Sequence, residues 1–138
     1  MQFLIETDVL CEYLIAAKGE ETILRKALAT GVCYTTMYNA LELFRAAKTK
    51  EESDAVMQML ICVRVLGFNS RTAQSFAETA REVEEKTGMI LSHRELMMIG
   101  LARTSKLTIL TKEHFERYNA SKAVAVAFSA EEVPNHAE

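Results

Sequence analysis

Short continuous runs of apolar residues alternate along the chain with stretches in which apolar residues recur every three or four positions. The runs predict buried β-strands, and the stretches predict amphipathic helices. The predicted strands are residues 3–5, 32–35, 63–66, 107–110 and 123–127. The predicted helices are residues 8–17, 20–29, 37–47, 52–60, 73–88, 92–104 and 111–118. Because strands alternate with helices, we expect an α/β fold whose central parallel sheet carries helices on both faces.

The length and composition are those of one globular domain. The chain has 138 residues, of which 49% are hydrophobic and 25% are charged. No repeat, low-complexity segment or linker divides it, so we expect a single domain over residues 1–130 and a frayed tail over residues 131–138. The net charge of −3 argues against a broad basic face for duplex DNA. It leaves a nuclease possible, because metal ions restore positive charge locally at an acidic cluster.

The cysteines and the opening of the chain bear on its compartment. Cys11, Cys33 and Cys62 share no CxxC spacing, and each lies in an apolar run, so we expect buried free thiols in a reducing compartment. The opening MQFLIETD lacks the features of a signal peptide, and no apolar run is long enough to span a bilayer. We therefore expect a cytoplasmic protein without membrane contact.

Acidic residues recur where the predicted strands end. Glu6 and Asp8 follow the first strand, and Glu42 lies in the helix after the second. Glu95 lies near the start of the helix before the fourth strand, and Glu113 follows that strand. Ligands of open parallel sheets bind outside the carboxyl ends of the strands. Converging carboxylates suit Mg²⁺ or Mn²⁺, and a pair of such ions can activate water for phosphodiester hydrolysis.

Four segments resemble the motifs of PIN domains in order and spacing. These are LIETDVLCEYL (family opening LLDTNVL), YTTMYNALELFRAA (a glutamate in an ELxxA-like helix), GMILSHRELMMIGLA (DxLIAA) and LTILTKEHFERY (LVTxDxxF). The resemblance extends to about Val126 and implies a three-layer α/β/α sandwich. Many family members are VapC-type toxin ribonucleases that use Mg²⁺ or Mn²⁺. The resemblance therefore also implies an RNA substrate, an antitoxin partner and a homodimer.

Carried over residue by residue, the resemblance implies a catalytic and metal-binding set of Glu6, Glu42, Glu95 and Glu113, with Asp8 as a further metal ligand. Three of these positions, 6, 95 and 113, carry glutamate where the family usually has aspartate, and the segment around the fourth acid is one residue short. Mg²⁺ requires near-ideal octahedral geometry, so the longer side chains would reshape the site.

Simpler interpretations of the same acids remain open. Ser92 and Glu95 match a capping box, in which glutamate serves only the helix. Glu42 lies beside an apolar stripe, as solvated boundary residues do, and Glu113 fits the first turn of any helix. Glu6 is the most informative acid, because a charge that ends a buried strand is costly without a partner. The first hypothesis is a metal-dependent ribonuclease. The alternative is a PIN fold with weak or no nuclease activity that binds RNA or a protein partner.

Overall fold

The structure is a computed structural model and describes residues 1–132. Its strands are β1 (Gln2–Ile5), β2 (Val32–Thr36), β3 (Arg64–Leu66), β4 (Thr108–Leu110) and β5 (Val126–Ala127). Its helices are α1 (Thr7–Ile15), α2 (Ile23–Thr30), α3 (Met37–Ala46), α4 (Lys50–Cys62), α5 (Ser70–Thr87), α6 (His93–Ser105) and α7 (Phe115–Ala120), followed by a 3₁₀ turn, η1 (Ala130–Glu132). Every predicted strand and helix is confirmed, with bounds shifted by a few residues. Of the predicted tail, residues 133–138 lie outside the described range.

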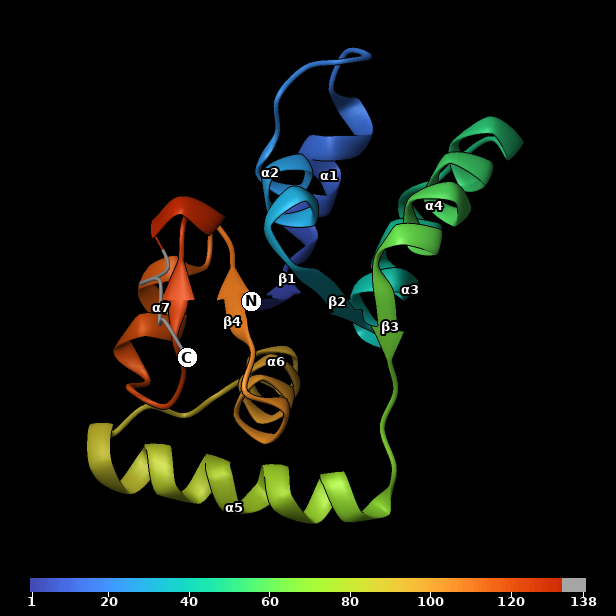
Figure 1. Ribbon diagram of the computed structural model, residues 1–138. Helices are drawn as coiled ribbons and strands as arrows, with labels where there is room; N and C mark the ends of the chain where they lie inside the picture. Colours follow the sequence, from blue (N-terminus) through green and yellow to red (C-terminus); the bar gives the residue numbers. More distant parts are fainter. Residues whose placement is uncertain (133–138) are drawn as a thin grey trace.

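The five strands form one parallel sheet in the order β3-β2-β1-β4-β5. Phe3 of the central strand β1 is paired with Cys33 of β2 on one side and with Thr108 of β4 on the other. Figure 1 shows α1 to α4 on one side of this sheet and α5 and α6 on the other. The predicted α/β class and the central parallel sheet are therefore confirmed.

Alternate residues of β1 supply the two cores of the sandwich. Phe3 and Ile5 pack among apolar side chains of α1, α2, α3 and α4. Leu4 faces the opposite way and packs with Phe76 of α5, with α6 and with Tyr118 of α7. Since successive side chains of a strand point to opposite faces, a short apolar run suffices to bind both helical layers. None of the helices within residues 1–132 combines the length and the apolar character needed to cross a membrane.

Helices begin immediately after strands at the carboxyl edge of the sheet. Glu6 caps α1 directly after β1, and Thr36 caps α3 directly after β2 through a reciprocal capping box with Asn39. These tight strand-to-helix turns place the first turns of both helices at the same edge, where ligands of parallel sheets bind. Helix α7 begins later than predicted, at Phe115 rather than at Thr111.

The three cysteines are all free, as expected, but their burial differs from the prediction. Cys33 in β2 is buried, whereas Cys11 of α1 and Cys62 of α4 are exposed. An apolar run in a surface helix contains positions that face outward, so its composition does not decide the burial of each residue. Burial raises the pKa of the Cys33 thiol to about 12, which makes this side chain a neutral part of the core.

Candidate functional site

Glu6 is a buried carboxylate at the carboxyl end of the central strand. Its side chain is fully buried. Oε1 accepts hydrogen bonds from the Thr7 backbone N–H at 2.8 Å, from Asn39 Nδ2 at 2.8 Å and from Arg94. Oε2 accepts a hydrogen bond from the Tyr118 hydroxyl. A buried charge is costly unless it is paired and hydrogen-bonded, so these donors explain how β1 can end in glutamate.

Arg94, near the start of α6, joins Glu6 to Glu42 of α3. Nη2 donates to Glu6 and Nη1 donates to Glu42, whose other oxygen accepts from Thr7 Oγ1 at 2.6 Å. The guanidinium carbon also lies 5.7 Å from the ring centroid of Tyr38, a distance at which a cation is attracted to an aromatic face. Burial alone would lower the pKa of Arg94, but the charge of Glu6 and the hydrogen bonds to both glutamates raise it. The guanidinium is therefore a permanent cation of this site.

Two neutral side chains complete the surroundings of Glu6. Asn39 Oδ1 accepts a hydrogen bond from the Thr36 hydroxyl at 2.6 Å. Its Nδ2 donates hydrogen bonds to Glu6 and to Thr7 Oγ1. This pattern fixes the orientation of the amide, because its oxygen and nitrogen each have matching partners. Tyr118 is buried, and its burial together with the charge of Glu6 raises its pKa. The phenol therefore stays protonated and donates to the carboxylate.

Asp8 holds the turn that follows β4. Its Oδ1 accepts from Thr111 Oγ1 at 2.9 Å, and its Oδ2 accepts from the backbone N–H groups of Lys112 at 2.7 Å and Glu113 at 3.0 Å. These bonds fix residues 111–113 in a non-helical turn, which explains why α7 begins only at Phe115. Asp8 thereby ties the segment after β4 to α1.

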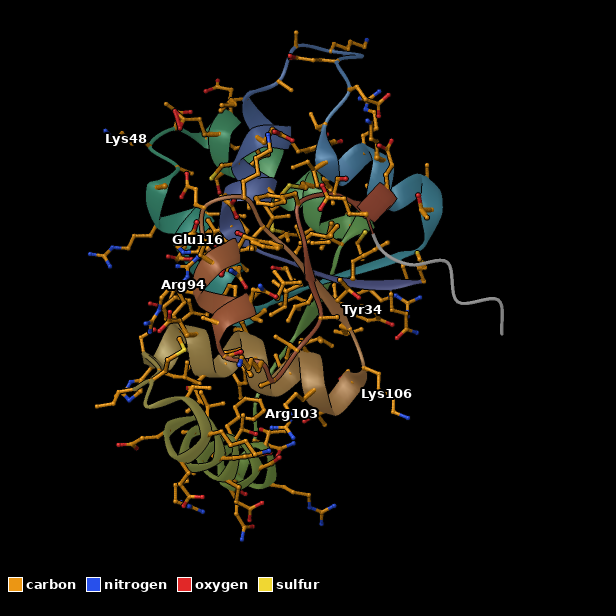
Figure 2. All side chains as sticks on the ribbon, turned by 90° about the vertical axis from the view of Figure 1, so that its left-hand side faces the viewer. Tyr34, Lys48, Arg94, Arg103, Lys106 and Glu116 are labelled. Atoms are coloured by element: carbon orange, nitrogen blue, oxygen red, sulfur yellow. The ribbon has the colours of Figure 1, made fainter. Side chains whose placement is uncertain are left out.

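An open hollow of about 570 Å³ lies beside these groups at the carboxyl edge of the sheet. Its wall contains both acidic and basic side chains, among them Asp8, Glu12, Glu42, Arg94, Lys112 and Glu113. Figure 2 shows Arg94 near one end of α6 and Lys106 just beyond the other, so the hollow lies at the N-terminal end of this helix. Three of these acids are already engaged by neighbouring protein groups: Glu42 by Arg94, Asp8 by the turn that follows β4, and Glu12 by Lys112.

Comparison with known proteins gives one consistent result. No family model and no curated protein matches the chain. Solved structures do match: VapBC-1 from nontypeable Haemophilus influenzae contains a chain with 16% identity and a TM-score of 0.70, over 92% of this chain and 97% of that one. VapBC2 from Rickettsia felis matches with 16% identity and a TM-score of 0.68, over 92% and 98%. FitAcB from Neisseria gonorrhoeae matches with 19% identity and a TM-score of 0.66, over 91% and 96%.

The chain has the VapC-type PIN fold. The three-layer α/β/α architecture implied by the four sequence segments is thereby confirmed. At this level of identity the similarity concerns the fold, so the chemistry of the site must be judged from its own side chains.

The PIN fold does not bring all four predicted glutamates together. Glu6 and Glu42 meet at one arginine, whereas Glu95 lies in a different set of contacts. Glu95 accepts from the Ser92 backbone N–H at 2.9 Å and from Arg117 Nε at 2.7 Å. The hydrogen bonds from Arg117, assisted by those from Ser92, lower its pKa to about 2 against the opposing effect of burial. The capping-box interpretation is therefore confirmed, and the catalytic and metal-binding role of Glu95 stays a prediction.

Glu113 lies on the wall of the hollow together with Glu42 and Asp8. Its predicted role, like those of the other acids, stays a prediction. Sequence reasoning did not identify Arg94, Asn39 and Tyr118 as the side chains that hold the buried carboxylate. The available signal was Glu6 itself: a charge that ends a buried strand requires donors, but the sequence does not say which distant residues supply them.

The hydrogen-bond donors around Glu6 leave no place for a divalent metal ion. Oε1 of Glu6 already accepts from Thr7, Asn39 and Arg94, and Oε2 accepts from the buried Tyr118 hydroxyl, so a metal ion would have to displace protein donors from this carboxylate. The guanidinium contacts both Glu6 and Glu42, as an ion shared between them would have to do. Within residues 1–132 no group of three His, Cys, Asp or Glu side chains is placed to hold a metal. The site as folded is an internal ion-pair centre.

Proposed function

We propose that this chain is the PIN-fold member of a protein pair of the toxin–antitoxin kind, and that it acts by binding a partner protein, with weak or no ribonuclease activity. The observation that carries the proposal is an apolar groove of about 310 Å³ between α1, α3 and α4. The structural comparison supports it, since one structure of similar fold is a toxin–antitoxin complex from Klebsiella pneumoniae, with 14% identity and a TM-score of 0.60.

The groove has the character of a helix-binding surface. Its wall is formed largely by small and aliphatic side chains: Cys11, Leu14, Ile15, Leu43, Ala46, Ala47, Ala55 and Val56. Ile15 in this wall is 85% exposed, and a large apolar side chain exposed within an apolar groove is typical of an interaction surface. An amphipathic helix that lays its apolar face into a groove of this kind is a common mode of peptide recognition.

The charges next to the groove specify the partner further. The groove and the hollow share Cys11 and Ile15, so the groove continues directly into the hollow with its charged side chains. More acidic than basic side chains line the hollow: Asp8, Glu12, Glu42 and Glu113 against Arg94 and Lys112. We therefore propose a partner helix that carries lysine or arginine residues next to its apolar face.

Co-purification with the product of a short adjacent reading frame tests this function. Ile15→Glu places a charge on the wall of the groove at a position that is exposed in the free chain, so the variant should fold and lose the partner. Ile90→Glu is the matched control, because Ile90 is 76% exposed but belongs to the loop before α6. Retention of the partner by Ile15→Glu at the level of the control would contradict the proposed groove.

A second candidate function is RNA cleavage with Mg²⁺ or Mn²⁺ through Glu6, Glu42, Glu95 and Glu113, supported by Asp8. The observation in its favour is that the hollow at the sheet edge collects three of these acids, Asp8, Glu42 and Glu113. Cleavage of single-stranded RNA in Mn²⁺, compared between wild type, Glu6→Gln and Glu95→Gln, distinguishes the two functions. We expect no cleavage above background by any of the three proteins. Cleavage by the wild type that is lost in either variant would favour the nuclease.

We further propose that the protein acts in the cytoplasm and as a homodimer. The cytoplasmic location is supported by the three free thiols, which suit a reducing compartment. Native mass spectrometry of the purified chain tests the dimer, which should appear at twice the 15.5 kDa mass of the chain.

A further inference from the structure

The contacts of Arg94 place a positive charge between two carboxylates from distant segments. Glu6 follows β1, Glu42 lies in α3, and Arg94 lies in the first turn of α6. The Arg94 side chain is 20% exposed, that of Glu42 is 33% exposed and that of Glu6 is fully buried. Two carboxylates at one buried position repel each other unless a cation lies between them. In this chain the cation is supplied by the protein itself.

The surroundings of Arg94 hold the guanidinium in this place. Both terminal nitrogens are engaged with carboxylates, and the ring of Tyr38 faces the guanidinium. Arg94 Nε is buried without a hydrogen-bond partner within the described residues. A side chain that leaves one donor unsatisfied must gain from the rest of its contacts, and here that gain comes from the two charge-assisted bonds.

We propose that Arg94 is a built-in substitute for a divalent cation, and that it keeps this site from binding Mg²⁺ or Mn²⁺. With Arg94 in place the three side chains carry one net negative charge, and the guanidinium fills the space between the carboxylates. An aspartate at position 94 would leave three acidic side chains facing one another. That arrangement favours a hard divalent ion with oxygen ligands, so a single substitution converts the ion-pair centre into a metal site.

The test is Mn²⁺ binding by the purified full-length chain, measured by calorimetric titration and by the thermal midpoint Tm. The wild type should show no saturable binding up to about 1 mM Mn²⁺, the range of weak protein cation sites. Arg94→Asp should bind Mn²⁺, and its Tm at saturating Mn²⁺ should be about 2–4 °C above that of the same variant without metal. Adding Glu42→Gln to this variant removes one ligand and should abolish the gain.

Two results would overturn the proposal. One is saturable Mn²⁺ binding by the wild type that Glu42→Gln removes, because the natural site would then accept the metal. The other is a folded Arg94→Asp protein that binds no Mn²⁺. If Arg94→Asp does not fold, Arg94→Gln keeps a neutral side chain of similar length and should gain weaker Mn²⁺ binding, so its failure to bind counts equally against the proposal.

This inference deepens the proposed function, since it explains why hydrolysis of RNA would be weak or absent. The two can fail separately. Metal binding is measured without a partner, and partner binding through the groove is measured without a metal. Loss of the partner in Ile15→Glu together with Mn²⁺ binding by the wild type would support the groove and refute the role of Arg94.

Discussion

Replacing Arg94 with methionine tests the ion-pair centre through stability. The substitution keeps most of the aliphatic stem and removes the charge, so Glu6 is left buried with three neutral donors. Removing one partner of a buried ion pair costs about 3–5 kcal/mol. Because neutral donors remain and Glu42 is partly exposed, we expect the lower end, about 3 kcal/mol. For a domain of this size that corresponds to a fall in Tm of roughly 10 °C.

A double-mutant cycle with Glu6→Gln isolates the interaction from other effects of the substitutions. Glu6→Gln alone should cost about 2 kcal/mol, because it leaves Arg94 paired with Glu42 only. If the charges stabilise each other, the double variant should cost about 3 kcal/mol rather than the sum, a coupling of about 2 kcal/mol. The assay is urea unfolding followed by circular dichroism, with unchanged m-values as the check on two-state behaviour.

The matched control is Arg81→Met, an exposed arginine on α5. It should change the free energy of unfolding by less than about 0.5 kcal/mol. The reasoning is refuted if Arg94→Met behaves like this control, or if the two single variants are additive within about 0.5 kcal/mol, since independent side chains would then occupy the site.

Three further substitutions probe other parts of the fold by urea unfolding. Tyr118→Phe removes a buried hydroxyl that donates to a carboxylate, and should cost about 1.5–3 kcal/mol. The ion pair of Glu95 with Arg117 lowers the pKa of Glu95 from 4.5 to about 2, so its contribution is present above pH 4.5 and is lost as the pH falls toward 2. Because Arg117 is half exposed, Glu95→Gln should remove only about 1 kcal/mol of this pH-dependent stability. Gly100→Ala would place a methyl group 2.3 Å from a ring carbon of Phe76, and should cost about 1–3 kcal/mol.

Each of these has a control in the chain. Tyr13→Phe, at a partly buried tyrosine of α1, and Glu78→Gln, at an exposed glutamate of α5, should change little. Gly67→Ala should be neutral, because an added Cβ at this glycine meets nothing within 4 Å. Equal effects of a test variant and its control would mean that the named contact does not contribute.

The secondary structure could be predicted from the order of apolar and polar residues. The run at residues 3–5 and the helical stripe that follows it become β1 and α1, and the same holds along the chain. This works because strand and helix periodicities differ and each element must bury its apolar face. The start of α7 could not be predicted, since it depends on Asp8, which binds the turn at residues 111–113 from more than 100 positions away.

The candidate site was predicted in its location and only partly in its members. The prediction of acids at the carboxyl edge follows from sheet topology, and Glu6, Glu42 and Glu113 do lie there. The sequence also contained the capping box of Ser92 and Glu95, a local pattern that needs no tertiary information. It could not choose between that role and a place in the acidic cluster.

The sequence by itself determined that a charged residue ends the buried central strand and that such a charge needs partners. Only the tertiary structure decided that those partners are Asn39, Tyr118 and Arg94, which lie 33, 112 and 88 positions from Glu6. Neighbouring residues of a helix point in different directions. For that reason Arg94 points toward Glu6, whereas Glu95, the next residue, points toward Arg117. Because Arg94 and not Glu95 faces Glu6 and Glu42, the site holds an internal ion pair instead of a third acid.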